Sequence, residues 1–246
     1  MIELSDRVAL VTGGSRGIGA ATTRLLAKLG ARVGFTFVAS EDEARVVERD
    51  AGSARAWRVD VRDPDQVSRF VNEAEAEWGG VDILIANAGI WKGAAIETMT
   101  PEEWRETIDV NLTGTYHVCR FGIPALRRRG GGAVVVVSST AGQRGEAGHS
   151  HYAATKGAQI SLVKSLAVEC APAIRVNAVA PGWVDTEMSA EPLAGTERSA
   201  IVGAIPLGRV ATADDIAHAI AFLASDQARH VTGEVLNVNG GSVLCG

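Results

Sequence analysis

Cysteine is scarce in this chain, and its three cysteines are scattered. Cys119, Cys170 and Cys245 are odd in number and lack the spacing of metal-ligand motifs. Such thiols are typical of proteins in a reducing compartment, and they argue against a disulfide-rich scaffold. We therefore expect no disulfide framework, no metal site and no catalytic cysteine.

Long hydrophobic runs are absent too. No apolar stretch approaches the ~20 residues that a membrane-spanning helix needs, and the N-terminus, MIELSDRVAL, is acidic where a secretion signal is basic. The net charge of −5, from 24 basic and 29 acidic residues, offers no electrostatic attraction to nucleic acid. The sequence thus predicts a soluble, cytoplasmic protein without membrane or nucleic-acid partners.

Repeats, low-complexity tracts and Pro/Ser-rich linkers are also missing, so the 246 residues are expected to form a single domain. Short apolar runs alternate with helical patterns along the whole chain. The strands are predicted at residues 8–11, 31–38, 54–59, 82–86, 134–137, 174–180 and 234–238. The predicted helices include residues 20–29, 64–78, 101–126, 214–224 and one that begins near residue 150. This alternation is typical of a doubly wound (Rossmann) α/β fold, a seven-stranded parallel sheet with helices on both faces.

A glycine-rich turn follows the first strand. Residues 12–19 read TGGSRGIG, and a helix is expected from Ala20. Strand, glycine turn and helix in this order place backbone N–H groups where they face a phosphate. The spacing is G-x-x-x-G-x-G rather than G-x-G-x-x-G, so a plain tight turn is the alternative interpretation.

The end of the second strand bears on which dinucleotide is bound. In dinucleotide-binding folds an acidic residue here holds the adenosine ribose 2′-OH. Residues 34–40 read GFTFVAS and contain no acid, whereas Arg16 in the glycine turn is placed to face a 2′-phosphate. NADP(H) is therefore favoured over NAD(H), although Glu41 and Asp42 follow closely and would oppose that phosphate.

Three polar residues gather around the fifth predicted strand. Ser139 stands at its carboxyl end, where open α/β sheets place their ligands. Ser150 is the expected cap of a helix on which Tyr152 and Lys156 share one face. An adjacent ammonium favours the phenolate and so lowers a tyrosine pKa of about 10. Tyr152 would then exchange a proton with an oxygen held by Ser139, although such a pair is also common as exposed surface.

Two further features need an explanation. Asn111 is a poor helix former inside a predicted helix. Either its side chain bonds its own helix, or the helix opens locally and holds a water. The helix that begins near residue 150 is apolar on most of its circumference, so we expect a second subunit to cover part of it.

Together these pieces resemble the short-chain dehydrogenase/reductase family over essentially the whole chain. The order of the motifs, with Ser139 thirteen residues before Tyr152, makes the resemblance specific. The residues that carry it are Thr12, Gly13, Gly17, Gly19, Asp60, Asn87, Ala88, Gly89, Asn111, Ser139, Tyr152, Lys156, Pro181, Gly182, Thr186 and residues 233–241. The resemblance implies hydride transfer between C4 of a nicotinamide and a carbonyl or alcohol carbon.

The resemblance also implies a role for each residue. Tyr152 would exchange the proton, Lys156 would bind the nicotinamide ribose and lower the tyrosine pKa, and Ser139 would orient the substrate oxygen. Asn111 would hold a water that links Lys156 to solvent. The implied cofactor contacts are Gly13, Ser15, Arg16, Gly17, Ile18 and Gly19 at the pyrophosphate, Asp60 and Val61 at the adenine, Asn87, Ala88 and Gly89 on the adenosine side, and Pro181, Gly182, Val184 and Thr186 at the carboxamide.

Within the family the chain looks most like the 3-oxoacyl-(acyl-carrier-protein) reductases and related tetrameric ketoreductases. Residues 14–19, 206–209 and 231–236 carry this likeness, which implies a homotetramer. Residues 170–173 read CAPA where carrier-dependent members bear a basic residue, although arginines at 127–129 could attract an acidic carrier. The substrate is thus expected to be a 3-oxoacyl thioester, carrier-bound or not, or a small free ketone.

The substrate end of the site is expected to be closed by a lid at about residues 183–206. Its mouth is predicted to be lined by Trp91, Gln143, Arg144, Glu146, His149, Trp183 and Met188. Two other functions stay open: an NAD-dependent alcohol dehydrogenase of a small metabolite, and a dinucleotide-sensing protein without turnover. Loss of the tyrosine or the lysine would mark the second, and both are present.

Overall fold

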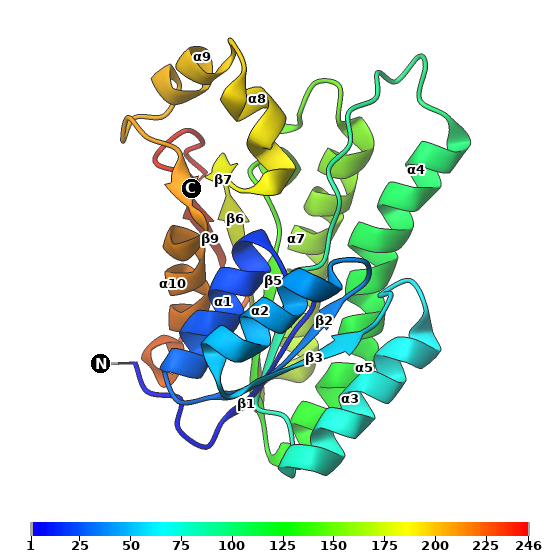
Figure 1. Cartoon of the computed structure of the whole chain (residues 1–246), viewed down its shortest axis with the longest axis vertical. Coiled ribbons are helices and arrows are strands. Elements are labelled where there is room, and N and C mark those ends of the chain that lie inside the picture. Colours follow the sequence, from blue (N-terminus) through cyan, green and yellow to red (C-terminus); the bar gives the residue numbers. More distant parts are fainter. Residues whose placement is uncertain (1, 246) are drawn as a thin grey trace.

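Seven parallel strands form the centre of the computed structural model, which describes residues 2–245 (Figure 1). Their order across the sheet is β3-β2-β1-β4-β5-β6-β9. The strands span Val8–Val11 (β1), Arg32–Phe37 (β2), Ala54–Arg58 (β3), Ile83–Ala86 (β4), Gly132–Val137 (β5), Ile174–Pro181 (β6) and Val235–Val238 (β9). The predicted fold class is confirmed. The chain reverses its direction of winding between β1 and β4, and such a switch point opens a crevice for ligands.

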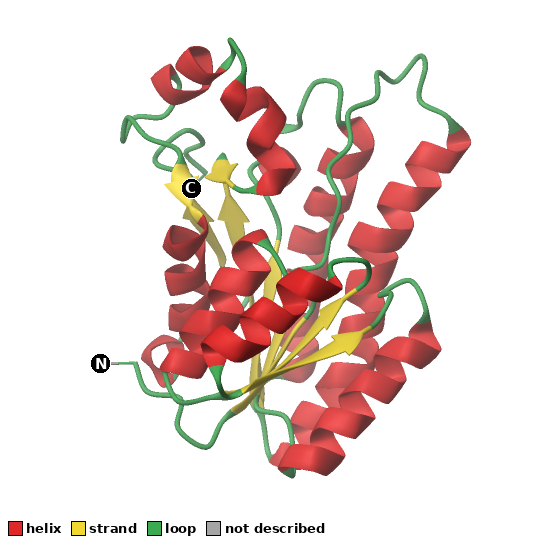
Figure 2. Cartoon of the chain, viewed as in Figure 1, coloured by secondary structure: helices red, strands yellow, loops and turns green. Residues whose placement is uncertain are grey.

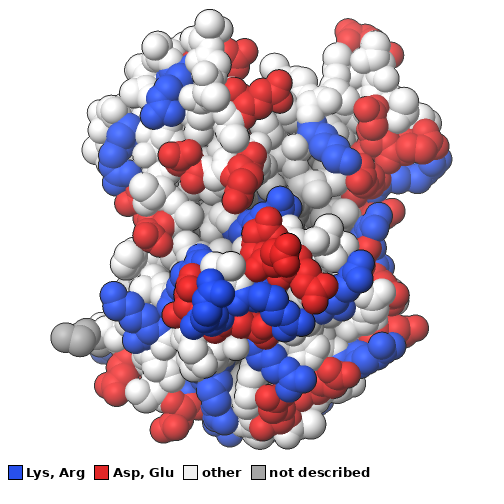
Figure 3. Space-filling model, viewed as in Figure 1, with Lys and Arg blue, Asp and Glu red and all other residues white. Residues whose placement is uncertain are grey.

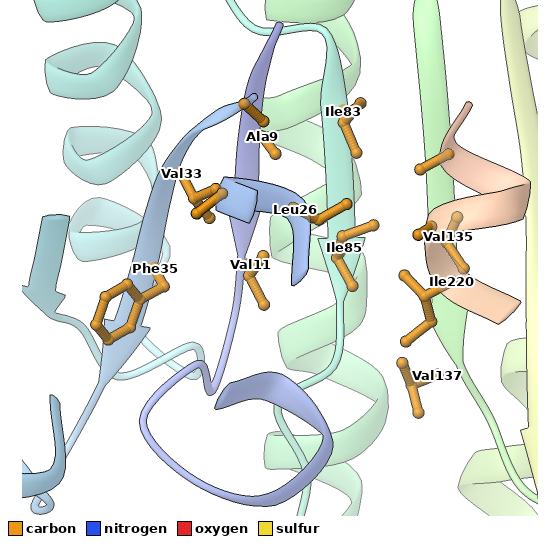
Figure 4. Packing of buried hydrophobic residues seen from close by; sticks show 14 of the residues in the cluster. Ala9, Val11, Leu26, Val33, Phe35, Ile83, Ile85, Val135, Val137 and Ile220 are labelled. Atoms are coloured by element: carbon orange, nitrogen blue, oxygen red, sulfur yellow. The ribbon is translucent and has the colours of Figure 1, made fainter. Parts of the chain in front are cut away.

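Helices cover both faces of the sheet (Figure 2). One layer contains α1 (Gly17–Lys28), α2 (Glu41–Ala51) and α10 (Ala213–Ala224). The other contains α3 (Pro64–Trp78), α5 (Gly114–Arg129) and α7 (Ser150–Cys170). Strand residues alternate between the two cores because successive side chains point to opposite faces. Figure 4 shows Val135 and Val137 of β5 pointing toward Ile220 of α10, whereas Val134 and Val136 enter the other core.

Several helix ends follow from local sequence. Asp63 caps α3 by accepting hydrogen bonds from the backbone N–H groups of Asp65 and Gln66, at 2.9 and 3.2 Å. Thr100 and Glu103 form a reciprocal capping box at the start of α4 (Pro101–Ile108). The expected Ser150 cap is a small correction: Ser150 is the first residue of α7, and His149 is the N-cap.

The single helix predicted over residues 101–126 is interrupted. A five-residue π-helical turn, η1 (Asp109–Thr113), separates α4 from α5. The turn contains Asn111, so the local opening expected there is present.

The segment expected to form the lid is folded rather than irregular. It contains β7 (Val184–Asp185), η2 (Glu187–Ser189), α8 (Ala190–Ala194) and α9 (Arg198–Gly203), and it sits above the carboxyl ends of the strands (Figure 1). β7 pairs with β8 (Ala211–Thr212) outside the main sheet. Among residues 2–245, no helix combines the length and apolarity needed to cross a membrane.

Candidate active site

A cavity of about 650 Å³ lies at the carboxyl edge of the sheet. It begins at the glycine turn after β1, passes the ends of β4 and β5, and reaches the lid. All the predicted cofactor residues line it, as do Ser139, Tyr152 and Lys156. Of the predicted substrate residues, Trp91, Arg144, Trp183 and Met188 line it, together with Glu146. Three predicted residues do not: Asn111, Gln143 and His149.

The glycine turn is held by the neighbouring strands. The Gly13 N–H donates to the Thr36 hydroxyl at 3.1 Å, and the Asn87 amide donates to the Gly13 carbonyl at 3.1 Å. Gly13 has a φ of +67°, and a Cβ on Gly19 would lie 2.1 Å from the Gly13 oxygen, so both positions require glycine. Thr36 is a contributor that the sequence analysis missed.

The turn fits the phosphates of a dinucleotide. The N-cap of α1 is Arg16, whose side chain makes no capping hydrogen bond. The first N–H groups of α1 therefore remain available to an anion in the cavity. Gly17 also packs against the lid, because a Cβ at this position would lie 3.2 Å from Cγ2 of Thr186.

The end of the cavity beside β2 has no acidic residue in its first stretch of wall. Val38, Ala39 and Ser40 continue the wall after β2. Arg16 is exposed and forms no ion pair with any residue between 2 and 245. Glu41, which was expected to oppose a phosphate, instead lies 3.4 Å from Arg45 on α2. The Asp60 carboxylate accepts hydrogen bonds from Arg62, as close as 2.6 Å.

Lys156 is buried at the junction of β5 and α7, with only 4% of its surface exposed. Its Nζ donates to the Val137 carbonyl at 2.7 Å and lies 5.6 Å from the centroid of the Tyr152 ring. The hydroxyl of Ser138 donates to the Lys156 carbonyl at 2.9 Å, which ties strand to helix. The Ser139 oxygen accepts from the Ala141 N–H at 3.1 Å, so its own proton is free to donate to a ligand.

The protonation of this pair differs from the expectation. Burial lowers the pKa of Lys156 to about 7. Burial also raises the pKa of Tyr152 to about 12, with the Ser139 hydroxyl acting against this shift and the Glu146 carboxylate adding to it. In the chain alone, therefore, the tyrosine pKa does not move toward neutrality, because desolvation of the phenolate is the largest influence on it. Tyr152 is a neutral phenol at pH 7 and can act as a proton donor.

Asn111 lies behind the cavity wall. Its side-chain amide donates to the Ile90 carbonyl at 2.9 Å, and its side-chain oxygen accepts from the Ile90 N–H at 2.8 Å. It thereby holds the segment that follows Gly89. Gln159 of α7 contacts Asn111 in turn and was missed by the sequence analysis. The sequence does contain a signal for Gln159: it is a polar residue three positions after Lys156, a spacing that places both side chains on one face of the helix.

The mouth of the cavity is aromatic. Trp91 stacks on His149 with 4.3 Å between ring centroids and 1° between planes, and it meets Trp183 edge to face at 5.9 Å. The Trp91 indole N–H donates to Glu146 at 3.3 Å. His149 therefore supports the wall rather than forming it. The Gln143 prediction is wrong: its side-chain amide donates to the side-chain oxygen of the half-buried Asn237 on β9, at 2.7 Å.

Comparison with known proteins supports an oxidoreductase. Residues 13–242 match the family described as Enoyl-(Acyl carrier protein) reductase. The chain is 39% identical to 3-oxoacyl-[acyl-carrier-protein] reductase FabG of Escherichia coli (strain K12), over 99% of this chain and all of that protein. It is 38% identical to acetoacetyl-CoA reductase of Shinella zoogloeoides, over 96% and 98% of the two chains. Cis-4-hydroxycyclohexanecarboxylate dehydrogenase of Sinomonas cyclohexanicum is 44% identical over 96% of each chain.

A solved structure agrees with this assignment. The short-chain dehydrogenase/reductase (glucose/ribitol dehydrogenase) of Brucella melitensis superposes with a TM-score of 0.94, at 33% identity over 99% of both chains. The resemblance inferred from the motifs is confirmed, and this chain belongs to the short-chain dehydrogenase/reductase family of oxidoreductases, among its 3-oxoacyl-(acyl-carrier-protein) reductase-like members.

Proposed function

We propose that this protein uses NADPH to reduce the ketone of a 3-oxoacyl thioester or a related compound. The observation that carries the proposal is the meeting of Ser139, Tyr152 and Lys156 in one cavity with the glycine turn. When bound, NADPH supplies the hydride. The similarity to 3-oxoacyl-[acyl-carrier-protein] reductase and acetoacetyl-CoA reductase supports the substrate class.

The residues divide the proton chemistry among them. Ser139 donates a hydrogen bond to the ketone oxygen and so stabilises the negative charge that develops there. Tyr152, a neutral phenol at pH 7, transfers its proton to that oxygen. Lys156 in its charged form stabilises the phenolate that is left behind, and it lies where it would also hold the nicotinamide ribose.

NADPH is proposed over NADH because of the cavity's adenosine end. Arg16 has no ion-pair partner among the described residues, and the wall after β2 contains no acid to hold a free 2′-OH. The glycine turn would hold the pyrophosphate. Pro181, Gly182, Val184 and Thr186 would contact the carboxamide at the lid side.

A thioester bound to a carrier protein is the less supported form of the substrate. Arg128 pairs with Glu75 at 2.6 Å, Arg129 with Asp82 at 3.3 Å, and Arg127 donates to the Glu169 carbonyl. The three-arginine run is therefore engaged within the chain. Figure 3 shows acidic and basic side chains interspersed over the face it displays, without a broad patch of one sign.

A second candidate is oxidation of a small alicyclic alcohol that carries a carboxylate. The relative from Sinomonas cyclohexanicum supports it, as does the aromatic mouth, which suits a compact ring. Arg144 lines the cavity without an ion-pair partner among the described residues, whereas Lys92 is paired with Glu106 at 2.7 Å. Arg144 would bind the carboxylate.

The test is a substrate panel followed by NADPH absorbance, with the Tyr152→Phe variant beside the wild type. It contains acetoacetyl-CoA, the matching carrier-bound thioester, cyclohexanone and 4-oxocyclohexanecarboxylate. Wild type is expected to reduce a thioester, and Tyr152→Phe to lose at least about 10²-fold in kcat with an unchanged Kd for NADPH. Full turnover by the variant would contradict the role of Tyr152. Preference for the carboxylated ring over cyclohexanone and the thioesters would favour the second candidate. Cofactor binding with no turnover on any compound would indicate a dinucleotide-sensing protein.

We also propose that the protein works as a cytoplasmic homotetramer. Its cysteines are all free, and Cys119 and Cys170 are buried. On the layer formed by α4, α5 and α7, large apolar side chains are exposed: Trp104, Tyr116 and, at 81%, Val168. A second copy of the chain on this layer would cover them.

A further inference from the structure

The π-helical turn η1 leaves backbone groups outside the regular helical pattern. The Gly114 N–H bonds the Asp109 carbonyl, five residues back, instead of the carbonyl four residues back. The Asn111 carbonyl, which lies within this turn, accepts hydrogen bonds from two side chains. The Thr115 hydroxyl and the Gln159 amide each donate to it, and both distances are 2.7 Å.

Gln159 is an unusual residue for its place. It lies on α7 with 1% of its surface exposed, and its amide also approaches the Thr115 hydroxyl at 2.8 Å. Its own side-chain oxygen is buried without a partner among the described residues. An unpartnered buried carbonyl destabilises the folded state, and an apolar side chain would avoid that cost. What a glutamine contributes here is therefore its N–H donors.

The contacts lead from Gln159 to the cavity in two steps. Gln159 holds the backbone of Asn111, and the Asn111 side chain holds both backbone groups of Ile90. The neighbouring Gly89 lines the cavity, where a Cβ would lie 3.2 Å from the Asn111 oxygen and 3.7 Å from the Lys156 Nζ. Every member of this path is buried or half-buried.

We propose that Gln159 is a positioning residue for the reaction, an inference that rests on the proposed function. It stabilises the π-helical turn by donating to the Asn111 carbonyl inside it, and through Asn111 it fixes residues 89–90 beside Lys156.

Three substitutions test the proposal. Gln159→Leu removes the donors at similar size, and Gln159→Glu keeps the shape but places an acceptor against the carbonyl. Gln227→Leu, on an exposed turn, is the matched control. We expect Gln159→Leu to lose about tenfold in kcat, with KM for NADPH and ketone within about twofold and the melting temperature nearly unchanged. The control should match the wild type.

The glutamate variant supplies a readout that a purely structural role would not move. A protonated carboxyl has one O–H donor, so the kcat of Gln159→Glu should rise relative to wild type as pH falls from 8 to 6. A fixed ratio across this range, or wild-type kcat in Gln159→Leu, would overturn the proposal. The rates are measured on whichever ketone the wild type reduces.

Hydrogen exchange separates this inference from the proposed function. The Ile90 N–H should exchange at least about tenfold faster in Gln159→Leu than in wild type, because Asn111 no longer protects it as well. This measurement needs no turnover. An inactive wild type with the exchange difference present would refute the ketone reductase alone, whereas unchanged exchange would refute the positioning role alone.

Discussion

Lys156 and Tyr152 show how strongly burial competes with proximity. Their spacing on α7 places a cation near a phenol. Desolvation nevertheless raises the pKa of Tyr152 and lowers the pKa of Lys156, and both shifts favour the neutral form of the side chain. For a reductase the neutral phenol is the useful form, since it holds the proton that the ketone oxygen needs. The sequence predicts which residues meet, whereas their protonation depends on how much water the fold removes.

Arg16 offers a direct test of cofactor choice at the residue scale. Arg16→Ala removes the cation that faces the adenosine end of the cavity, so kcat/KM for NADPH should fall roughly 10- to 100-fold, while kcat/KM for NADH changes little. Initial rates with both cofactors measure this. Arg49→Ala, an exposed arginine on α2 whose side chain is 73% accessible, is the matched control. A wild type that prefers NADH would contradict the proposal.

Gln143 shows where residue patterns mislead. It lies on α6 (Ala141–Arg144), close in sequence to Ser139, so it was expected at the substrate mouth. Its side-chain amide instead donates a hydrogen bond to Asn237, 94 positions away in the sequence. The partner becomes visible only once β9 is placed next to β6.

At the scale of the element, the strands were the most predictable part. β5 contains a run of four valines that is buried on both faces, as its composition indicated. The helix over residues 101–126 was only partly correct, because periodicity does not distinguish a continuous helix from one interrupted by a π-turn. Gln159, which lies on a different helix, donates a hydrogen bond to this turn.

The glycine turn provides a prediction for an element. In Gly19→Ala, a Cβ would lie 2.1 Å from the Gly13 oxygen and 2.6 Å from the Asn87 amide. The turn must shift, which should destabilise the fold by about 1–3 kcal/mol and weaken NADPH binding at least about tenfold. Thermal unfolding and cofactor titration measure the two effects.

Gly203→Ala in α9 is the control for this substitution, because a Cβ there meets no atom within 4 Å. Its melting temperature should equal or slightly exceed that of wild type, since alanine favours a helix. Equal behaviour of the two alanine variants would show that the turn tolerates a side chain.

At the scale of the whole molecule, the exposed apolar side chains of α4, α5 and α7 give a prediction about assembly. Val168→Glu places a charge on the exposed apolar layer of α4, α5 and α7, where a second subunit would bury it. Light scattering of the wild type should give four times the chain mass, and the variant should give a smaller species. Val46→Glu, on α2 of the opposite layer, should remain tetrameric. A monomeric wild type would refute the assembly.

The sequence by itself determined the class of sheet, the positions of its strands along the chain and the presence of Ser139, Tyr152 and Lys156 in one cavity. Each of these depends on local signals: apolar runs, a glycine turn, and polar groups at fixed spacings. Only the tertiary structure decided the charge state of Tyr152 and Lys156, the π-turn around Asn111 and the direction of Gln143. Those features depend on burial and on partners from distant segments, and local sequence does not specify either one.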